Sequence, residues 1–221
     1  MKLTIGHLYP DLLNLYGDRG NIQCMMKRCQ WRGIDAETIE FTLEDKIDFT
    51  KLDIVLLGGG SDREQMLVCD RLRTIQKDFH DYVEDGGSVI AVCGGYQLLG
   101  HYYDTDEGRI EGLSLVDLYT EQGSPRLIDN IVLQNDAFEH PIVGFENHGG
   151  QTFDISTPFG KVLFGNGNKF GDSEEGFFKE NVIATYLHGP LLSKNPELAD
   201  RFIKTALEIK YSEVALEELD D

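Results

Sequence analysis

The sequence predicts an α/β protein with a mainly parallel sheet, helices on both faces of that sheet, and extra strands in its second half. Short apolar runs alternate with segments of helical composition along the first hundred residues, which is the order that βαβ units produce. Two of these runs, DIVLL at 53–57 and SVIAV at 88–92, are almost wholly apolar and are followed by glycines or a cysteine. Such runs are typical of buried parallel strands.

The first half of the chain is expected to alternate strands and helices. An apolar strand opens the chain, and the two runs named above supply the next buried strands. A single long helix is predicted between those runs, ended by Gly86 and Gly87. The predicted strands are Leu3–Leu8, Glu37–Phe41, Asp53–Leu57 and Ser88–Val92, and the predicted helices are Asn21–Trp31 and Glu64–Glu84.

The second half is richer in strand patterns. Five segments read as strands, LSLVDLYT, RLIDNIVLQ, PIVGFEN, GKVLFGNG and NVIATYLHG, and a helix is predicted from about Pro196 to Ile209. No internal repeat and no Pro/Ser-rich linker interrupts the pattern. We therefore expect one domain over residues 1–221, with an acidic tail over about 211–221 that forms a solvated helix end or a frayed terminus.

Composition excludes several classes of function. Of the 221 residues, 41% are hydrophobic, which is enough for a real core. The net charge is −19, with 39 acidic against 20 basic residues, which argues against nucleic acid or an anionic lipid surface as the main partner. No signal peptide or membrane-length apolar run is visible, so we expect a cytoplasmic protein.

The cysteines do not suggest a metal site. No C-x-x-C pair or Cys/His cluster has zinc spacing, and no bound metal is predicted. Cys24, Cys29 and Cys69 lie in helical patterns, where a small buried thiol that packs in the core is expected.

Cys93 has a different setting, because it ends the strand predicted over Ser88–Val92 and a short helical pattern follows it. In parallel α/β sheets, ligands gather at the carboxyl ends of the strands. A sharp turn that displays a nucleophile needs small residues two positions before and after it, and Ala91 and Gly95 meet this requirement. The helix beginning at Gly94 directs its N–H groups at the sulfur and favours the thiolate. Cys93 is therefore the candidate nucleophile.

A thiol nucleophile also needs a group that carries protons. His188 lies in NVIATYLHGP, after a predicted buried strand and before a Gly-Pro turn, so it is expected at the same edge of the sheet as Cys93. His148, in GFENHGG, has a similar setting and is the second candidate. The remaining histidines have no comparable setting: His7, His80, His101 and His140.

Glycines near the candidate nucleophile predict an oxyanion hole, which is a set of donors for the negative charge on an attacked carbonyl oxygen. Gly94 is next to Cys93, and Gly59 and Gly60 belong to the glycine loop that follows the neighbouring predicted strand. Glycine lets the backbone approach a substrate closely. The backbone N–H groups of these three glycines are the predicted donors.

Three motifs in order, LLGGG, AVCGGYQLLG and ATYLHGP, resemble those of class I glutamine amidotransferases. The Y-L-H-G sequence is similar to the cobyric acid synthase-like branch of that family. The stretches LYPDLLNLYGDRGN and GFENHGGQT most resemble the glutaminase subunits of lipid II isoglutaminyl synthases. The resemblance runs from Leu8 to about Pro190, and it implies the flavodoxin-like fold of these domains.

The resemblance implies a reaction and further site residues. Cys93 would attack the side-chain amide of glutamine to form a γ-glutamyl thioester, His188 would pass a proton to the leaving ammonia, and water would release glutamate. Arg126, in GSPRLIDN, would hold the α-carboxylate of glutamine, because a guanidinium can bind a carboxylate through two hydrogen bonds. Gln97, one helical turn after Cys93, is a candidate for the lip of the pocket.

The sequence does not identify the third catalytic group. Many class I relatives have a glutamate two residues after the histidine, whereas this chain has Pro190. Glu146, Asp18 and Glu197 are possible carboxylates, and nothing in the sequence ranks them. The alternatives are a Cys–His dyad or a group supplied by another protein.

The resemblance also implies a partner. Free ammonia is lost as ammonium, and this chain has no G-x-x-x-x-G-K-[ST] phosphate loop of its own. The implied partner is a Mur-ligase-like (MurT-like) synthetase subunit, in a heterodimer, that amidates the D-glutamate of the lipid II stem peptide to D-isoglutamine. ATP and Mg²⁺ would belong to that partner, so no cofactor is expected here. The alternatives are a glutaminase for another synthetase, such as a cobyrinate-type amidase, a stand-alone cysteine hydrolase and a non-catalytic binding subunit.

Overall fold

The computed structural model describes residues 1–221 and contains two six-stranded sheets. The first sheet has the strand order β11-β12-β4-β3-β1-β2, and every pair in it is parallel except β11 with β12. Its strands are β1 (Lys2–Leu8), β2 (Asp35–Phe41), β3 (Ile54–Leu57), β4 (Ser88–Val92), β11 (Phe177–Lys179) and β12 (Val182–Thr185). The predicted mainly parallel α/β fold is confirmed.

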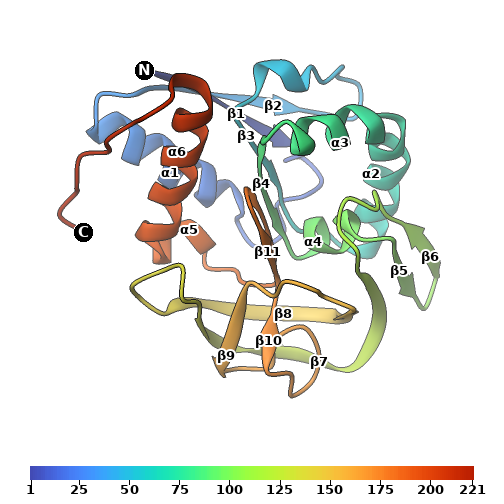
Figure 1. Cartoon of the computed structure of the whole chain (residues 1–221). Coiled ribbons are helices and arrows are strands. Elements are labelled where there is room, and N and C mark those ends of the chain that lie inside the picture. Colours follow the sequence, from blue (N-terminus) through green and yellow to red (C-terminus); the bar gives the residue numbers. More distant parts are fainter.

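Helices cover both faces of the first sheet (Figure 1). One face carries α1 (Arg19–Trp31), α5 (Leu191–Lys194) and α6 (Pro196–Tyr211), and the other carries α2 (Asp62–Thr74), α3 (Gln76–Glu84) and α4 (Gly94–Leu99), with the one-turn helix η1 (Phe49–Lys51) before β3. Helix α2 begins with a capping box between Ser61 and Glu64. None of the helices is both long and apolar enough to cross a membrane.

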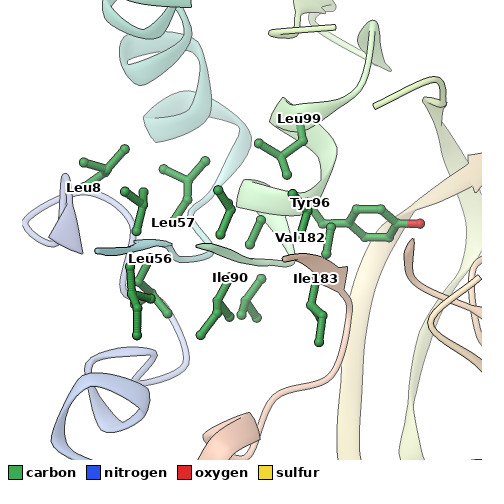
Figure 2. Packing of buried hydrophobic residues seen from close by; sticks show 14 of the residues in the cluster. Leu8, Leu56, Leu57, Ile90, Tyr96, Leu99, Val182 and Ile183 are labelled. Carbon is green, nitrogen blue, oxygen red and sulfur yellow. The ribbon is translucent and has the colours of Figure 1, made fainter. Parts of the chain in front are cut away.

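The central strands of the first sheet are buried on both faces. All residues of β3 and β4 are buried, as expected for strands with helices above and below them. Figure 2 shows Ile90 and Ile183 on one face of the sheet and Leu99 of α4 over the other. These residues belong to a single apolar cluster of 55 buried residues that also includes Ile131 and Leu133 of the second sheet.

The second sheet lies at the carboxyl end of the first (Figure 1). Its strands are β5 (Tyr102–Thr105), β6 (Gly108–Glu111), β7 (Tyr119–Gln134), β8 (Ile142–Phe153), β9 (Gly160–Phe164) and β10 (Glu174–Glu175). The long pair β7 and β8 is antiparallel. Phe145 of β8 and His188, which follows β12, exchange both backbone hydrogen bonds, at 2.8 and 3.0 Å. This bridge joins the two sheets next to the candidate site.

The single helix predicted over Glu64–Glu84 is wrong, because the structure has two helices there. The chain leaves helical geometry at Ile75, with φ −115° and ψ 10°, and α3 begins at Gln76. No glycine or proline marks the break. The apolar stripe also keeps helical spacing across it, at Val68, Leu72, Ile75, Phe79 and Tyr82. Pattern alone therefore predicts one continuous helix.

The predicted strand over LSLVDLYT is wrong for its first six residues. Leu113, Leu115 and Val116 donate backbone hydrogen bonds to the end of α4 instead of pairing with a strand. Strand β7 then runs from Tyr119 to Gln134 as one element, although its pairing with β8 shifts register between Gln122 and Leu127. The strands β5, β6, β10 and β11 and the helix α5 were not predicted.

The acidic tail does not simply project into solvent. After α6 it crosses α1, where Arg32 Nε donates to the carbonyl of Glu217 at 2.6 Å. Arg28, which is almost fully buried, donates to Asp200 of α6 and to Asp221 of the tail. Buried guanidinium groups require such carboxylate partners, and this requirement draws the tail onto the helix pair.

Candidate active site

Cys93 lies in the sharp turn between β4 and α4, as predicted. Its backbone has φ +52° and ψ −106°, a strained conformation for a residue with a side chain. The turn is possible only because its neighbours are small. A Cβ atom added to Gly95 would lie 2.4 Å from the carbonyl oxygen of Leu57, and Ala91 is fully buried. The strain and the close packing present the sulfur at the carboxyl edge of the sheet.

His188 is fully buried, and its imidazole interacts with the side chain of Cys93. The backbone bridge to Phe145 fixes its main chain, and two aromatic rings enclose its imidazole. The ring of Tyr16 meets it at an angle of 61° with centroids 4.6 Å apart, and the ring of Phe145 stacks on it at 5.3 Å. Packing between these two rings therefore holds the imidazole in one orientation.

Asp18 is the carboxylate that faces His188. Its Oδ1 lies 3.6 Å from His188 Nδ1, and both side chains are almost completely buried. Its Oδ2 accepts the N–H of Gly59 at 2.8 Å, which anchors the carboxylate to the glycine loop. A separation of 3.6 Å is an ion-pair contact rather than a short hydrogen bond.

The other two carboxylates considered lie elsewhere. Glu146 faces His148 at 3.5 Å and accepts hydrogen bonds from Asn166. Glu197 caps the backbone at Glu139 on the surface. Of the three, only Asp18 can orient the imidazole of His188 through Nδ1.

His148 is not a rival proton carrier for Cys93. Its imidazole stacks on Tyr186 with the ring centroids 3.6 Å apart, and its Nδ1 donates to the carbonyl of Gly150 at 2.7 Å. These interactions hold the ring between β8 and the segment that follows β12, whereas the imidazole that interacts with Cys93 is that of His188.

The charge state of His188 follows from opposing effects. Burial lowers its pKa, but the attraction of the imidazolium to Asp18 and Cys93 outweighs burial and raises the pKa to about 9. At neutral pH the imidazole is therefore protonated. An imidazolium beside a thiol stabilises the thiolate, which is the nucleophilic form of cysteine.

Two of the three predicted oxyanion donors remain available. The N–H of Gly59 is taken by Asp18, so this glycine supports the carboxylate. The N–H of Gly60 has no acceptor within the chain. A Cβ atom added to Gly94 would lie 3.1 Å from Gly60 N, so these two backbones are in close contact beside Cys93.

Arg126 and Tyr16 lie at one side of this site. Arg126 Nε donates to Asn147 Oδ1 at 2.7 Å, and its Nη2 donates to the carbonyl of Asn147 at 3.1 Å and lies 3.4 Å from the hydroxyl of Tyr16. Since Tyr16 also contacts the His188 ring, it links the guanidinium to the candidate catalytic residues. No role was predicted for Tyr16, although the stretch LYPDLLNLYGDRGN contains it.

Gln97 lies inside the protein rather than on the surface of α4. Only 3% of the residue is exposed, its Oε1 accepts from Gln65 at 3.0 Å, and its Nε2 donates to the hydroxyl of Tyr186 at 3.2 Å. Its place at the lip of the pocket stays a prediction.

Other features of the molecule do not compete with this site. No group of three or more His, Cys, Asp or Glu side chains is arranged to hold a metal ion. A surface hollow of about 1000 Å³ lies between η1, α3 and α6, at the amino ends of the strands. It contains neither a cysteine nor a histidine.

Comparisons with known proteins agree with the geometry. The model of the CobB/CobQ-like glutamine amidotransferase domain matches residues 4–196. The chain is 44% identical to the lipid II isoglutaminyl synthase (glutamine-hydrolyzing) subunit GatD of Staphylococcus aureus over 210 residues, which cover 95% of this chain and 86% of that protein. It is 41% identical to the GatD subunit of Streptococcus pneumoniae, with 96% of this chain and 83% of that protein covered.

Two further similarities are weaker. A cobyric acid synthase of Clostridium botulinum is 30% identical over 158 residues, which cover 66% of this chain but only 32% of that protein. The fold is similar to a crystal structure of a glutamine amidotransferase, with a TM-score of 0.60, 16% identity, and coverage of 91% of this chain and 98% of that chain. At this identity the structural match supports the fold alone.

Proposed function

Because the chain belongs to the CobB/CobQ-like glutamine amidotransferase family, we propose that it hydrolyses L-glutamine to glutamate and ammonia as the glutaminase subunit of a lipid II isoglutaminyl synthase. The two GatD relatives, similar along almost the whole chain, support this subunit role. The observation that carries the proposed chemistry is the meeting of Cys93, His188 and Asp18 at one edge of the first sheet.

The first half of the reaction forms a thioester. The Cys93 thiolate attacks the side-chain carbonyl carbon of glutamine, and the N–H groups of Gly60 and Gly94 stabilise the oxyanion that develops. The imidazolium of His188 gives its proton to the leaving nitrogen, the C–N bond breaks, and ammonia departs. Asp18 keeps the imidazole oriented and stabilises its positive charge.

The second half of the reaction releases glutamate. Neutral His188 takes a proton from water, the hydroxide formed attacks the thioester carbonyl, and the C–S bond breaks. Glutamate leaves, and the thiolate–imidazolium pair is restored. Throughout, Arg126 binds the α-carboxylate of the substrate.

The ammonia needs an acceptor site on another protein. We propose that a Mur-ligase-like synthetase subunit forms a heterodimer with this chain in the cytoplasm and uses ATP and Mg²⁺ to amidate the D-glutamate of lipid II. The product, D-isoglutamine, would place the chain in peptidoglycan synthesis and cell-shape maintenance. A cobyrinate-type acceptor is less favoured, because the matching cobyric acid synthase is less similar and is aligned over only a third of its length.

Labelling of the site tests the proposed chemistry. The glutamine analogue diazo-oxo-norleucine is expected to attach to Cys93 alone, as read by peptide mass spectrometry, and L-glutamine is expected to compete with it. A stand-alone hydrolase would instead cleave other amides as well as glutamine, and a non-catalytic subunit would not be labelled. Either result would contradict the proposal.

Replacement of Arg126 should weaken substrate binding more than catalysis. A charge-assisted pair of hydrogen bonds contributes about 1.5–3 kcal/mol, so Arg126→Ala is expected to raise the KM for glutamine roughly 10- to 100-fold. Steady-state kinetics measure this change. Arg109→Ala is a matched control, because Arg109 pairs with Asp104 within the β5–β6 hairpin. Unchanged glutamine kinetics in Arg126→Ala would remove Arg126 from the pocket.

Replacement of Asp18 should alter the pH dependence of hydrolysis. Ammonia release needs protonated His188, so kcat/KM is expected to fall as the pH rises through about 9. Asp18→Asn removes a charge that raises this pKa, while burial continues to lower it. The alkaline limb should move down by at least one pH unit, and kcat should fall at least about tenfold.

Glu197→Gln provides the control for this experiment, because Glu197 is a carboxylate outside the site. Its pH profile should match that of the unmodified protein. If Asp18→Asn kept the original alkaline limb and kcat, the orienting carboxylate would have to come from elsewhere, for example from the partner subunit.

A further inference from the structure

Gln65 of α2 is a buried side chain that joins two separate parts of the candidate site. Only 2% of the residue is exposed. Its Nε2 donates to the carbonyl of Gly60 at 3.3 Å and to Gln97 Oε1 at 3.0 Å. Gly60 lies in the loop between β3 and α2, whereas Gln97 lies on α4. One carboxamide therefore ties the glycine loop to the helix that follows the nucleophile.

These two parts supply the donors proposed for the oxyanion hole, namely the N–H groups of Gly60 and Gly94. A Cβ atom added to Gly94 would lie 2.9 Å from Gln65 Cδ, 3.0 Å from Gln65 Nε2 and 3.1 Å from Gly60 N. The carboxamide of Gln65 is thus packed directly against Gly94 while it is bonded to Gly60. It contacts both donor residues from the interior of the protein.

A hydrogen-bond chain beyond Gln97 supports this arrangement. Gln97 Nε2 donates to the hydroxyl of Tyr186, and this hydroxyl lies 2.7 Å from Thr152 Oγ1. Thr152 Oγ1 in turn lies 2.9 Å from Thr120 Oγ1. The carbonyl of Gly60 can only accept, so Gln65 turns its NH₂ group to this side and the Gln97 amide meets it with Oε1. A donor is therefore required at position 65, facing two oxygen acceptors at once.

We propose that Gln65 is a positioning residue that sets the separation of the Gly60 and Gly94 N–H groups and so forms the oxyanion hole. The inference rests on the proposed glutaminase function. Gln65 would act through these two backbones rather than by touching substrate. Its loss should therefore raise the energy of the tetrahedral transition state without changing ground-state binding of glutamine or the nucleophilicity of Cys93.

Two variants test this role. Gln65→Met keeps the length of the side chain but has no donor, and Gln65→Glu presents a carboxylate to both acceptors. Because loss of one oxyanion donor costs about 10²–10³ in kcat, displaced donors should cost roughly 10- to 100-fold. The KM for glutamine should change by less than about threefold. Thermal melting checks that each variant is folded.

Two further measurements separate positioning from a general structural role. Glutamate γ-semialdehyde forms a thiohemiacetal with a thiol, and the oxygen of this adduct would occupy the oxyanion hole. The inhibition constant of the semialdehyde should therefore rise in the Gln65 variants by the same factor as kcat falls. Alkylation of Cys93 by iodoacetamide needs no oxyanion hole, so its rate should stay unchanged. Gln76→Met is the matched control, because Gln76 of α3 donates to the carbonyl of Leu113 outside the site. This control should keep the kcat, the KM, the inhibition constant of the semialdehyde and the iodoacetamide rate of the unmodified protein.

Two results would overturn the positioning role. The first is unchanged kcat in a folded Gln65→Met variant. The second is an equal loss of semialdehyde affinity and iodoacetamide rate, which would indicate general disruption of the site. If the unmodified protein and Gln76→Met themselves failed to hydrolyse glutamine, the proposed function would fail instead, so the two failures are distinguishable.

Discussion

Cys93→Ala is expected to abolish glutamine hydrolysis while leaving the fold intact. The thioester cannot form without the sulfur, and removal of a catalytic nucleophile typically costs roughly 10⁴-fold or more in kcat. The side chain is small, and alanine keeps the Cβ atom in the turn, so little packing is lost. Ammonia release by the purified chain measures the effect, and circular dichroism and thermal melting check the fold. Cys93→Ser is expected to be inactive as well.

Cys29→Ala is the matched control for this variant. Burial raises the pKa of the Cys29 thiol to about 11, so this cysteine stays protonated and unreactive at neutral pH. Its replacement should leave hydrolysis and labelling by diazo-oxo-norleucine intact. Retention of more than a few per cent of ammonia release in Cys93→Ala would show that another group is the nucleophile.

His188→Ala should produce the second largest loss of activity. The variant removes the group that protonates the leaving ammonia and deprotonates water, and such a loss costs on the order of 10²–10⁴ in kcat. It also removes the cation that stabilises the thiolate, so the rate of iodoacetamide alkylation at neutral pH should fall. Added imidazole is expected to restore part of the activity, because a purely structural defect would not respond to it.

His148→Ala distinguishes the two histidines that the sequence brought forward. Its imidazole is buried against Tyr186 and paired with Glu146, so the variant should lose stability but retain most of the hydrolysis of the folded protein. If a fully folded His148→Ala variant were inactive while His188→Ala remained active, His148 would be the proton carrier instead of His188.

The sequence alone determined the parallel α/β order and the two residues at its carboxyl edge. The apolar runs followed by Gly58 and by Cys93 predict buried strands from local sequence alone, and the structure confirms both as central strands of the first sheet. His188 follows a third such run, β12, which pairs with β4. Because parallel strands end at the same edge, side chains that follow them are brought together without any knowledge of the loops.

Local pattern was insufficient where backbone geometry interrupts or extends an element. The break at Ile75 leaves the apolar residues of α2 and α3 at helical spacing, so no residue in the sequence indicates that the helix is interrupted there. The Gly-Ser-Pro stretch at 123–125 is typical of a turn, yet β7 continues through it because β8 pairs on either side. At 123–125 the pairing with β8 outweighs the local preference for a turn.

Only the tertiary structure decided the third catalytic group and the supports of the oxyanion hole. Asp18, Glu146 and Glu197 have no local feature that ranks them, and 170 positions separate Asp18 from His188 in the chain. Asp18 is selected because the turn before α1 reaches the edge where β3, β4 and β12 end, whereas Glu146 meets His148 and Glu197 meets surface backbone. The same folding assigns the Gly59 N–H to Asp18 and places Gln65 behind Gly60 and Gly94. Spacing along the sequence specifies which elements form and where they end, but a contact between two distant loops depends on how those elements pack.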